Sequence, residues 1–153
     1  MGLVLGCLAV GVSSVMAATG ARATMTNASV GPCNASYCHV YMSFGITSGN
    51  EAIFIPKASG LALATTSTPF NPASVLAATA NTTNVVPGDS ATAYFMPAGA
   101  YRIFGYSGKL YRSGSATGLH TLRITQINYT TLFTRANRAI TTGLDNLVVA
   151  KVF

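Results

Sequence analysis

The sequence of 153 residues is poor in charged and catalytic side chains. It contains three acidic residues, two histidines, three cysteines and no tryptophan, and 8% of its residues are charged, against about 25% in typical soluble domains. General acid–base catalysis needs titratable groups held close together, and three acids along the whole chain offer few such pairs. We therefore expect no enzymatic activity, no catalytic residues, no cofactor and no metal site.

Two chemical motifs can be drawn from the sequence, but neither is specific. A serine could join His120 and Asp89 in a triad, although any protein of this size permits such a set. The stretch "GYSGKLYRSG" lacks the spacing of a phosphate-binding loop, so we interpret it as a hairpin with glycine turns. We expect His39 and His120 on the polar faces of strands.

The few charges are unevenly distributed, and the net charge is +6. The acids are Glu51, Asp89 and Asp145, whereas most of the bases lie in the C-terminal half. A surface with so little charge provides weak repulsion between copies of the chain. We expect a domain that is glycosylated, assembled with copies of itself, or both.

The cysteine spacing predicts one disulfide bond. Cys33 and Cys38 bracket "CNASYC", which can close a small loop if a turn brings the α-carbons within about 4.4–6.8 Å. Half of a zinc site is the alternative, but zinc needs four ligands, and His39 and His120 are the only histidines. A disulfide favours an extracellular or cell-surface location. Cys7 is interpreted as a small buried apolar residue.

Four sequons match the acceptor pattern for N-linked glycans. The tight loop between the two cysteines should expose Asn34, whereas Asn128 lies in a predicted strand and is the least suitable acceptor. The complete set is Asn27, Asn34, Asn81 and Asn128.

Alternating hydrophobicity predicts a mainly β domain, an antiparallel β-sandwich or a jelly-roll-like fold, over residues 25–153. In "YCHVYMSFGI" the even-numbered residues are apolar, which is typical of a half-buried strand. "EAIFIPK" follows the turn-rich "TSGN", which predicts a hairpin with that strand. Further strands are expected at 61–65, 91–97, 100–106, 109–112, 119–133 with a bulge near Gln126, and 145–153.

Two segments predict connections between these strands. "MPAGAY" places Pro97 and Gly99 where a reverse turn needs them, and indicates a hairpin tip. Residues 58–88 carry no charge. They are interpreted as a covering loop with a short helix near Ala73 to Ala80, or as a strand that packs against a neighbouring subunit.

The first 24 residues form a separate apolar segment, which we expect to be helical and to be retained. It lacks the basic start of a secretory signal and falls a little short of the ~20 apolar residues of a membrane span, although membrane contact before assembly is compatible with it. Small residues let helices approach closely. The assembly residues predicted on this basis are Gly2, Gly6, Ala9, Gly11, Ser13, Ser14 and Ala17.

An apolar N-terminal helix followed by a β head rich in Ser, Thr and Asn, with sequons, resembles the subunits of archaeal type IV pilus-like filaments. The resemblance is one of architecture and covers the whole chain. It implies a structural subunit that polymerises with copies of itself, with helices in the filament core and heads outside.

Three alternatives remain open. In donor-strand assembly, residues 19–30 would complete the sheet of the next subunit. A secreted adhesive or carbohydrate-binding β domain would need no polymerisation. A jelly-roll virion or capsid protein would bind nucleic acid through interleaved aromatic and basic residues. That set is Tyr101, Arg102, Tyr106, Lys109, Tyr111, Arg112 and Arg123.

Overall fold

The structure, a computed structural model, describes residues 20–66, 77–78, 87–112 and 117–153. Within these ranges the regular elements are all β-strands, which confirms the mainly β class. The strands are β1 (Arg22–Cys33), β2 (Tyr37–Thr47), β3 (Ile53–Pro56), β4 (Leu61–Thr65), β5 (Ala77–Ala78), β6 (Ala93–Met96), β7 (Tyr101–Tyr111), β8 (Leu119–Thr131), β9 (Asn137–Ile140) and β10 (Val148–Val152).

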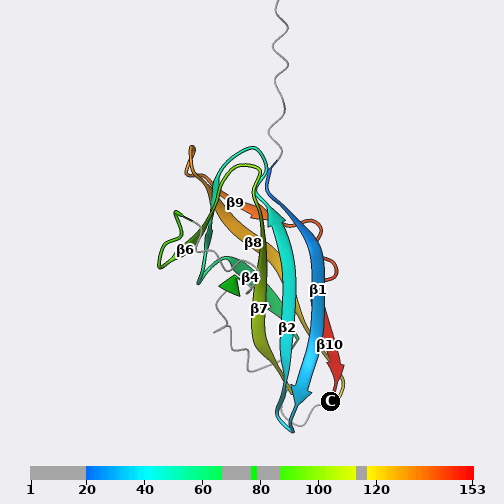
Figure 1. The fold of residues 1–153 in the computed structure, drawn as a ribbon. Helices are drawn as coiled ribbons and strands as arrows, with labels where there is room; N and C mark the ends of the chain where they lie inside the picture. Colours follow the sequence, from blue (N-terminus) through cyan, green and yellow to red (C-terminus); the bar gives the residue numbers. More distant parts are fainter. Residues whose placement is uncertain (1–19, 67–76, 79–86, 113–116) are drawn as a thin grey trace, which may run out of the picture.

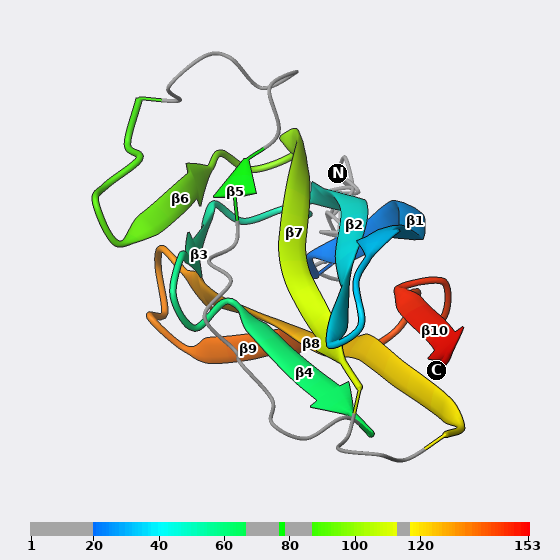
Figure 2. The same ribbon diagram turned by 90° about the horizontal axis from the view of Figure 1, so that it is seen from below.

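The strands form two antiparallel sheets that face each other (Figures 1 and 2). The first sheet has the order β1-β2-β7-β5. The second has the order β10-β8-β3-β6, and β4 and β9 also pair with β8. Because each sheet has one apolar face, stacking the two faces removes both from water. The fold is therefore sandwich-like, as the alternating pattern predicts.

The core lies between the sheets and is supplied by alternate residues. β2 and β7 bury their even-numbered residues, and Phe44 and Phe104 stack across the strand pair with ring centroids 6.2 Å apart. The second sheet contributes Ile53, Ile55 and Ile127, which are almost fully buried. Removing apolar surface from water at about 25 cal/mol per Å² is the main force that holds the two sheets together.

The bulge predicted near Gln126 is confirmed. Along β8 the buried positions are even-numbered up to Ile124 and odd-numbered from Ile127 onward. The pairing with β4 shifts at the same point, because Ala62 lies opposite Gln126 whereas Leu63 lies opposite Ile124. The extra residue keeps both halves of this long strand facing the core.

Two predicted hairpins are wrong, because each joins strands of different sheets. β2 pairs with β1 and β7, whereas β3 pairs with β6 and β8. The turn at "MPAGAY" likewise links β6 of the second sheet to β7 of the first. The turn itself is present: Ala100 N donates to Pro97 O at 3.1 Å, and Gly99 has a φ of +71°. Turn residues predict a change of direction, but not whether the chain stays in one sheet.

The first sheet also corrects the interpretation of "GYSGKLYRSG". β7 runs unbroken from Tyr101 to Tyr111, and Gly105 and Gly108 lie within it instead of in turns. A side chain at Gly108 would collide with the ring of Tyr106, so this glycine makes room for an aromatic side chain. Part of the helix expected near Ala73 to Ala80 is strand β5, and β9 was not anticipated.

The N-terminal boundary differs from the one expected. β1 begins at Arg22, so residues 22–24, which we assigned to the helix, are strand residues. Residues 1–18, with the predicted assembly residues and Cys7, lie outside the described residues. In the part of the chain that is described, no helix is long and apolar enough to cross a membrane.

Candidate functional site

The predicted disulfide between Cys33 and Cys38 is confirmed, and it closes the hairpin between β1 and β2. The two α-carbons are 3.9 Å apart, closer than the range expected, and the cysteines lie directly opposite each other in the strand register. Asn34 sits at the exposed tip, where its side-chain oxygen accepts hydrogen bonds from the backbone N–H groups of Ser36 and Tyr37, both at 2.8 Å. The side-chain nitrogen, which would carry a glycan, takes part in neither bond.

The other sequons have different surroundings. Asn27 is exposed on β1, an edge strand of the first sheet. Asn128 lies inside β8, and its side-chain nitrogen donates to the carbonyl of Ser59 at 2.8 Å. The predicted strand position of Asn128 is confirmed, and its unsuitability as an acceptor stays a prediction. Asn81 lies outside the described residues.

We expect material from a glycosylating host to contain the Cys33–Cys38 disulfide and a glycan on Asn34. Reduction should then raise the intact mass by two hydrogens, and deglycosylation should lower it by whole glycan units. Replacing Asn34 with Gln should remove one glycan, whereas Asn128→Gln, the matched control, should leave the mass pattern unchanged apart from the substitution. Two free thiols in native, non-reduced material would contradict the prediction.

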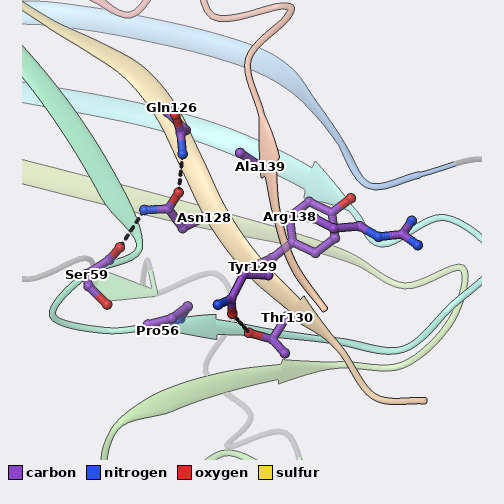
Figure 3. A pocket seen from close by; sticks show the side chains of 9 residues that line it. Pro56, Ser59, Gln126, Asn128, Tyr129, Thr130, Arg138 and Ala139 are labelled. Atoms are coloured by element: carbon purple, nitrogen blue, oxygen red, sulfur yellow. Dashed lines mark hydrogen bonds between the residues drawn. The ribbon is translucent and has the colours of Figure 1, made fainter. Parts of the chain in front are cut away.

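A cleft of about 440 Å³ opens along β8 and β9 (Figure 3). Its polar side chains largely bond to one another. Gln126 and Asn128 share a hydrogen bond at 2.5 Å, and Thr130 donates to Asn137 at 3.3 Å. Arg138 is its one charged lining residue, and no lining side chain is an acid or a histidine. The cleft can therefore offer hydrogen bonds to a neutral ligand, but it holds no pair of groups for acid–base chemistry.

A row of aromatic side chains lies on the outer face of the first sheet, and we call it the aromatic row: Tyr37, His39, Tyr41 and Tyr111. Tyr37 is 5.3 Å from His39 and 5.6 Å from Tyr111, measured between ring centroids. The amino group of Lys109 lies 4.2 Å from the ring centre of Tyr37.

The neighbouring edge strand leaves space for the aromatic row. A side chain at Gly31 of β1 would come within 2.6 Å of the ring of Tyr41. Tyr41 is 46% exposed and lies across this glycine. Aromatic rings held on a flat sheet can stack on planar or apolar faces of a ligand. The alternation in residues 37–41 contains three of the four members of this row, and Tyr111 joins them from the neighbouring strand β7.

The structure separates the aromatic and basic residues proposed for nucleic-acid binding. Tyr101, Lys109 and Tyr111 point outward from β7, whereas Arg102 and Tyr106 are buried. Arg123 lies on β8, in the other sheet. Interleaving along a strand places alternate residues on opposite faces, so this set does not form one surface.

Arg102 instead belongs to a buried ion pair with Asp89. Both guanidinium ends contact the carboxylate, at 2.8 and 2.7 Å, and the two side chains are only 5% and 11% exposed. The hydrogen bonds from Arg102 are the main reason that the pKa of Asp89 lies below its ordinary value of 3.8, and burial opposes them. Asp89 also accepts a hydrogen bond from the backbone N–H of Phe95 at 2.8 Å, and this bond ties the loop that carries Asp89 to β6.

His120 was expected on a polar face, and this is wrong. It is 5% exposed and packs edge-on against Phe153 at 5.3 Å between ring centroids. His39 does lie on the outer face, in the aromatic row. Among the described residues, no three His, Cys, Asp or Glu side chains group closely enough to hold a metal ion.

No family model, curated protein or solved structure matches this chain. The described domain combines a sandwich-like fold, a disulfide-bonded hairpin, an outward aromatic row and a cleft whose polar side chains largely bond to one another.

Proposed function

We propose that the chain is a non-catalytic structural subunit of an extracellular filament or pilus, which assembles with copies of itself through residues 1–18. The observation that carries the proposal is that an apolar N-terminal segment is joined directly to a β-sandwich domain. An uncharged segment of apolar and small residues leads directly into the edge strand of a sandwich whose described strands share one buried core. In the proposal, this apolar segment is available for contact between subunits.

The spacing of the small residues supports helix packing in this segment. In a helix of about 3.6 residues per turn, Gly2, Gly6, Ala9, Ser13 and Ala17 fall on one face. Gly11 and Ser14 fall on the other side of the same helix. Small residues on two faces suit a helix that has close neighbours on more than one side, as in the core of a filament.

The place of β1 favours a helical core over donor-strand assembly. Residues 22–33 already pair with β2 of the same chain, and this pairing covers most of β1 from Arg22↔Thr47 to Cys33↔Cys38. A donated strand would have to leave this ladder and its disulfide-bonded hairpin.

The charge of the head has a small effect on association. The Asp89–Arg102 pair removes one of three acids and one of nine bases from the surface charge, so two acids and eight bases remain outside it. This net positive charge opposes the approach of two heads, but charged residues make up only 8% of the chain, so the repulsion to be overcome is weak.

A secreted adhesive or carbohydrate-binding domain is the second candidate, because the aromatic row offers a ready stacking surface. This role is compatible with a filament, in which heads face outward. It would also hold for a soluble monomer.

Negative-stain microscopy of native material, combined with N-terminal sequencing, tests the proposal. We expect filaments whose subunits retain residues 1–18. Filaments that begin near Ala18 would favour donor-strand assembly, icosahedral particles would favour a capsid protein, and a soluble monomer that begins near Ala18 would reject assembly.

A further inference from the structure

One end of the sandwich presents apolar and cationic side chains beside the point where the chain enters the domain. The turn between β8 and β9 carries Leu132 and Phe133, which are 39% and 79% exposed. In Figure 1 this turn lies at the same end as the start of β1, whereas the β1–β2 hairpin and the C-terminus lie at the opposite end. We call the end with Leu132 and Phe133 the entry end.

The projecting turn is held firmly in place. Arg135 N donates to Thr131 O at 3.1 Å, and the hydroxyl groups of Thr131 and Thr134 are hydrogen-bonded. Leu132 N donates to Ala52 O at 2.9 Å, which ties the turn to the loop before β3. Exposure of Phe133 is therefore a property of an ordered turn.

A cation occupies a turn position that favours glycine. Arg135 has a φ of +50°, the only positive φ among the described non-glycine residues. Side chains other than glycine are disfavoured there, and such positions often mark functional sites. Arg135 is exposed, and so are Arg138, three residues further on, and Arg22, at the start of β1.

The rest of the entry end adds little negative charge. The β2–β3 and β6–β7 loops reach it and join each other through the bond from Gly99 N to Gly49 O at 2.6 Å. Glu51 is the one acid in these two loops, and one of its carboxylate oxygens is buried. The exposed Arg22, Arg135 and Arg138 therefore outnumber the acid.

The sequence before β1 indicates which kind of surface the entry end faces. Residues 1–21 contain no charged side chain, and their apolar part is only a little shorter than the ~20 apolar residues that cross a bilayer. Gly20 and Ala21 line a small hollow together with Thr131 and Arg138, so this segment joins the domain next to the exposed turn.

We propose that the entry end rests on an anionic lipid bilayer. Leu132 and Phe133 insert among the headgroups, while Arg22, Arg135 and Arg138 contact lipid phosphates. Apolar side chains flanked by arginines bind such an interface through both burial and charge. The inference concerns the subunit before assembly and does not depend on a filament as the product.

The absence of tryptophan makes a direct test possible. The full-length Phe133→Trp variant is reconstituted in vesicles of phosphatidylcholine and phosphatidylglycerol whose acyl chains are brominated near the headgroup. Bromine should quench its fluorescence to less than about half, because the ring lies in the interface. Adding Arg135→Gln and Arg138→Gln should weaken the quenching in these anionic vesicles. The same two substitutions should leave the quenching unchanged in vesicles of brominated phosphatidylcholine alone.

Leu119→Trp is the matched control, because Leu119 is a 62% exposed apolar residue at the other end of β8. A strand of 13 residues at about 3.3 Å per residue places it roughly 40 Å from the turn, outside the bilayer. We expect no quenching there. Equal quenching of the two variants, no quenching of Phe133→Trp, or failure of the protein to float with vesicles would overturn the inference. Microscopy of the same variants reports separately on filament formation.

Discussion

Replacing Asp89 with asparagine is expected to lower the free energy of unfolding by about 3–5 kcal/mol, the range found when one partner of a buried ion pair is removed. The substitution preserves the shape of the side chain and an oxygen for the bond from Phe95 N. It removes the charge that two guanidinium nitrogens of Arg102 contact at 2.8 and 2.7 Å. Chemical denaturation measures the loss.

The expected loss in the free energy of unfolding is large because Arg102 is buried. This side chain is 5% exposed, and its Nε is already buried without a hydrogen-bond partner. Stacking over Tyr94, 4.8 Å from the ring centre, remains in the variant but cannot replace a full opposite charge. Asp89→Asn therefore leaves a buried cation that water cannot solvate.

Two further variants distinguish this cause from a general loss of packing. Asp145→Asn removes an exposed acid and should change stability by less than about 0.5 kcal/mol. Adding Arg102→Met to Asp89→Asn should recover part of the lost stability, because the buried charge is gone. A loss below about 1 kcal/mol for Asp89→Asn would contradict the assignment of a stabilising pair.

The ion pair also predicts how stability depends on pH. The pKa of Asp89 in the folded protein is held below 3.8, mainly by the hydrogen bonds from Arg102. The contribution of this carboxylate is therefore fully present above pH 3.8 and is lost as the pH falls through the lower pKa of the folded state. Asp89→Asn should lose less stability than the natural sequence over that acid range.

Alternation predicted the long strands well, because burial of one sheet face leaves a period of two in the sequence. β2 and β8 follow this pattern, and the bulge at Gln126 appears as a break in it. The pairing of strands could not be predicted in the same way. An apolar face fits either sheet, so the residues after "TSGN" carry no information that sends β3 to the second sheet.

Surface features depend on hydrogen bonds and backbone conformations that the spacing of residues in the sequence does not reveal. The disulfide was predictable because Cys33 and Cys38 are close in sequence. The exposed turn was not, because the strand predicted over residues 119–133 includes Leu132 and Phe133. The strand ends at Thr131, where side-chain hydroxyl groups and the left-handed backbone of Arg135 close the turn.

Replacing Gly6 or Gly11 with leucine is expected to abolish filament assembly while leaving the β head folded. In the proposed helical core, contact between backbones depends on residues without bulky side chains, and leucine would hold neighbouring helices apart. Gly6 and Gly11 fall on opposite sides of such a helix, so each variant tests a different contact. Sedimentation and negative-stain microscopy measure the amount of polymer.

Val4→Leu is the matched control, because it adds one methylene to a residue that is already large and keeps the segment apolar. This variant should assemble like the natural sequence. The head should unfold at the same denaturant concentration in all three variants, since its core is supplied by β2, β7, β8 and the strands that face them. Normal filaments from both Gly6→Leu and Gly11→Leu would show that residues 1–18 are not the packing element. Loss of assembly in Val4→Leu as well would point to a general effect of side-chain volume instead of close contact at glycine.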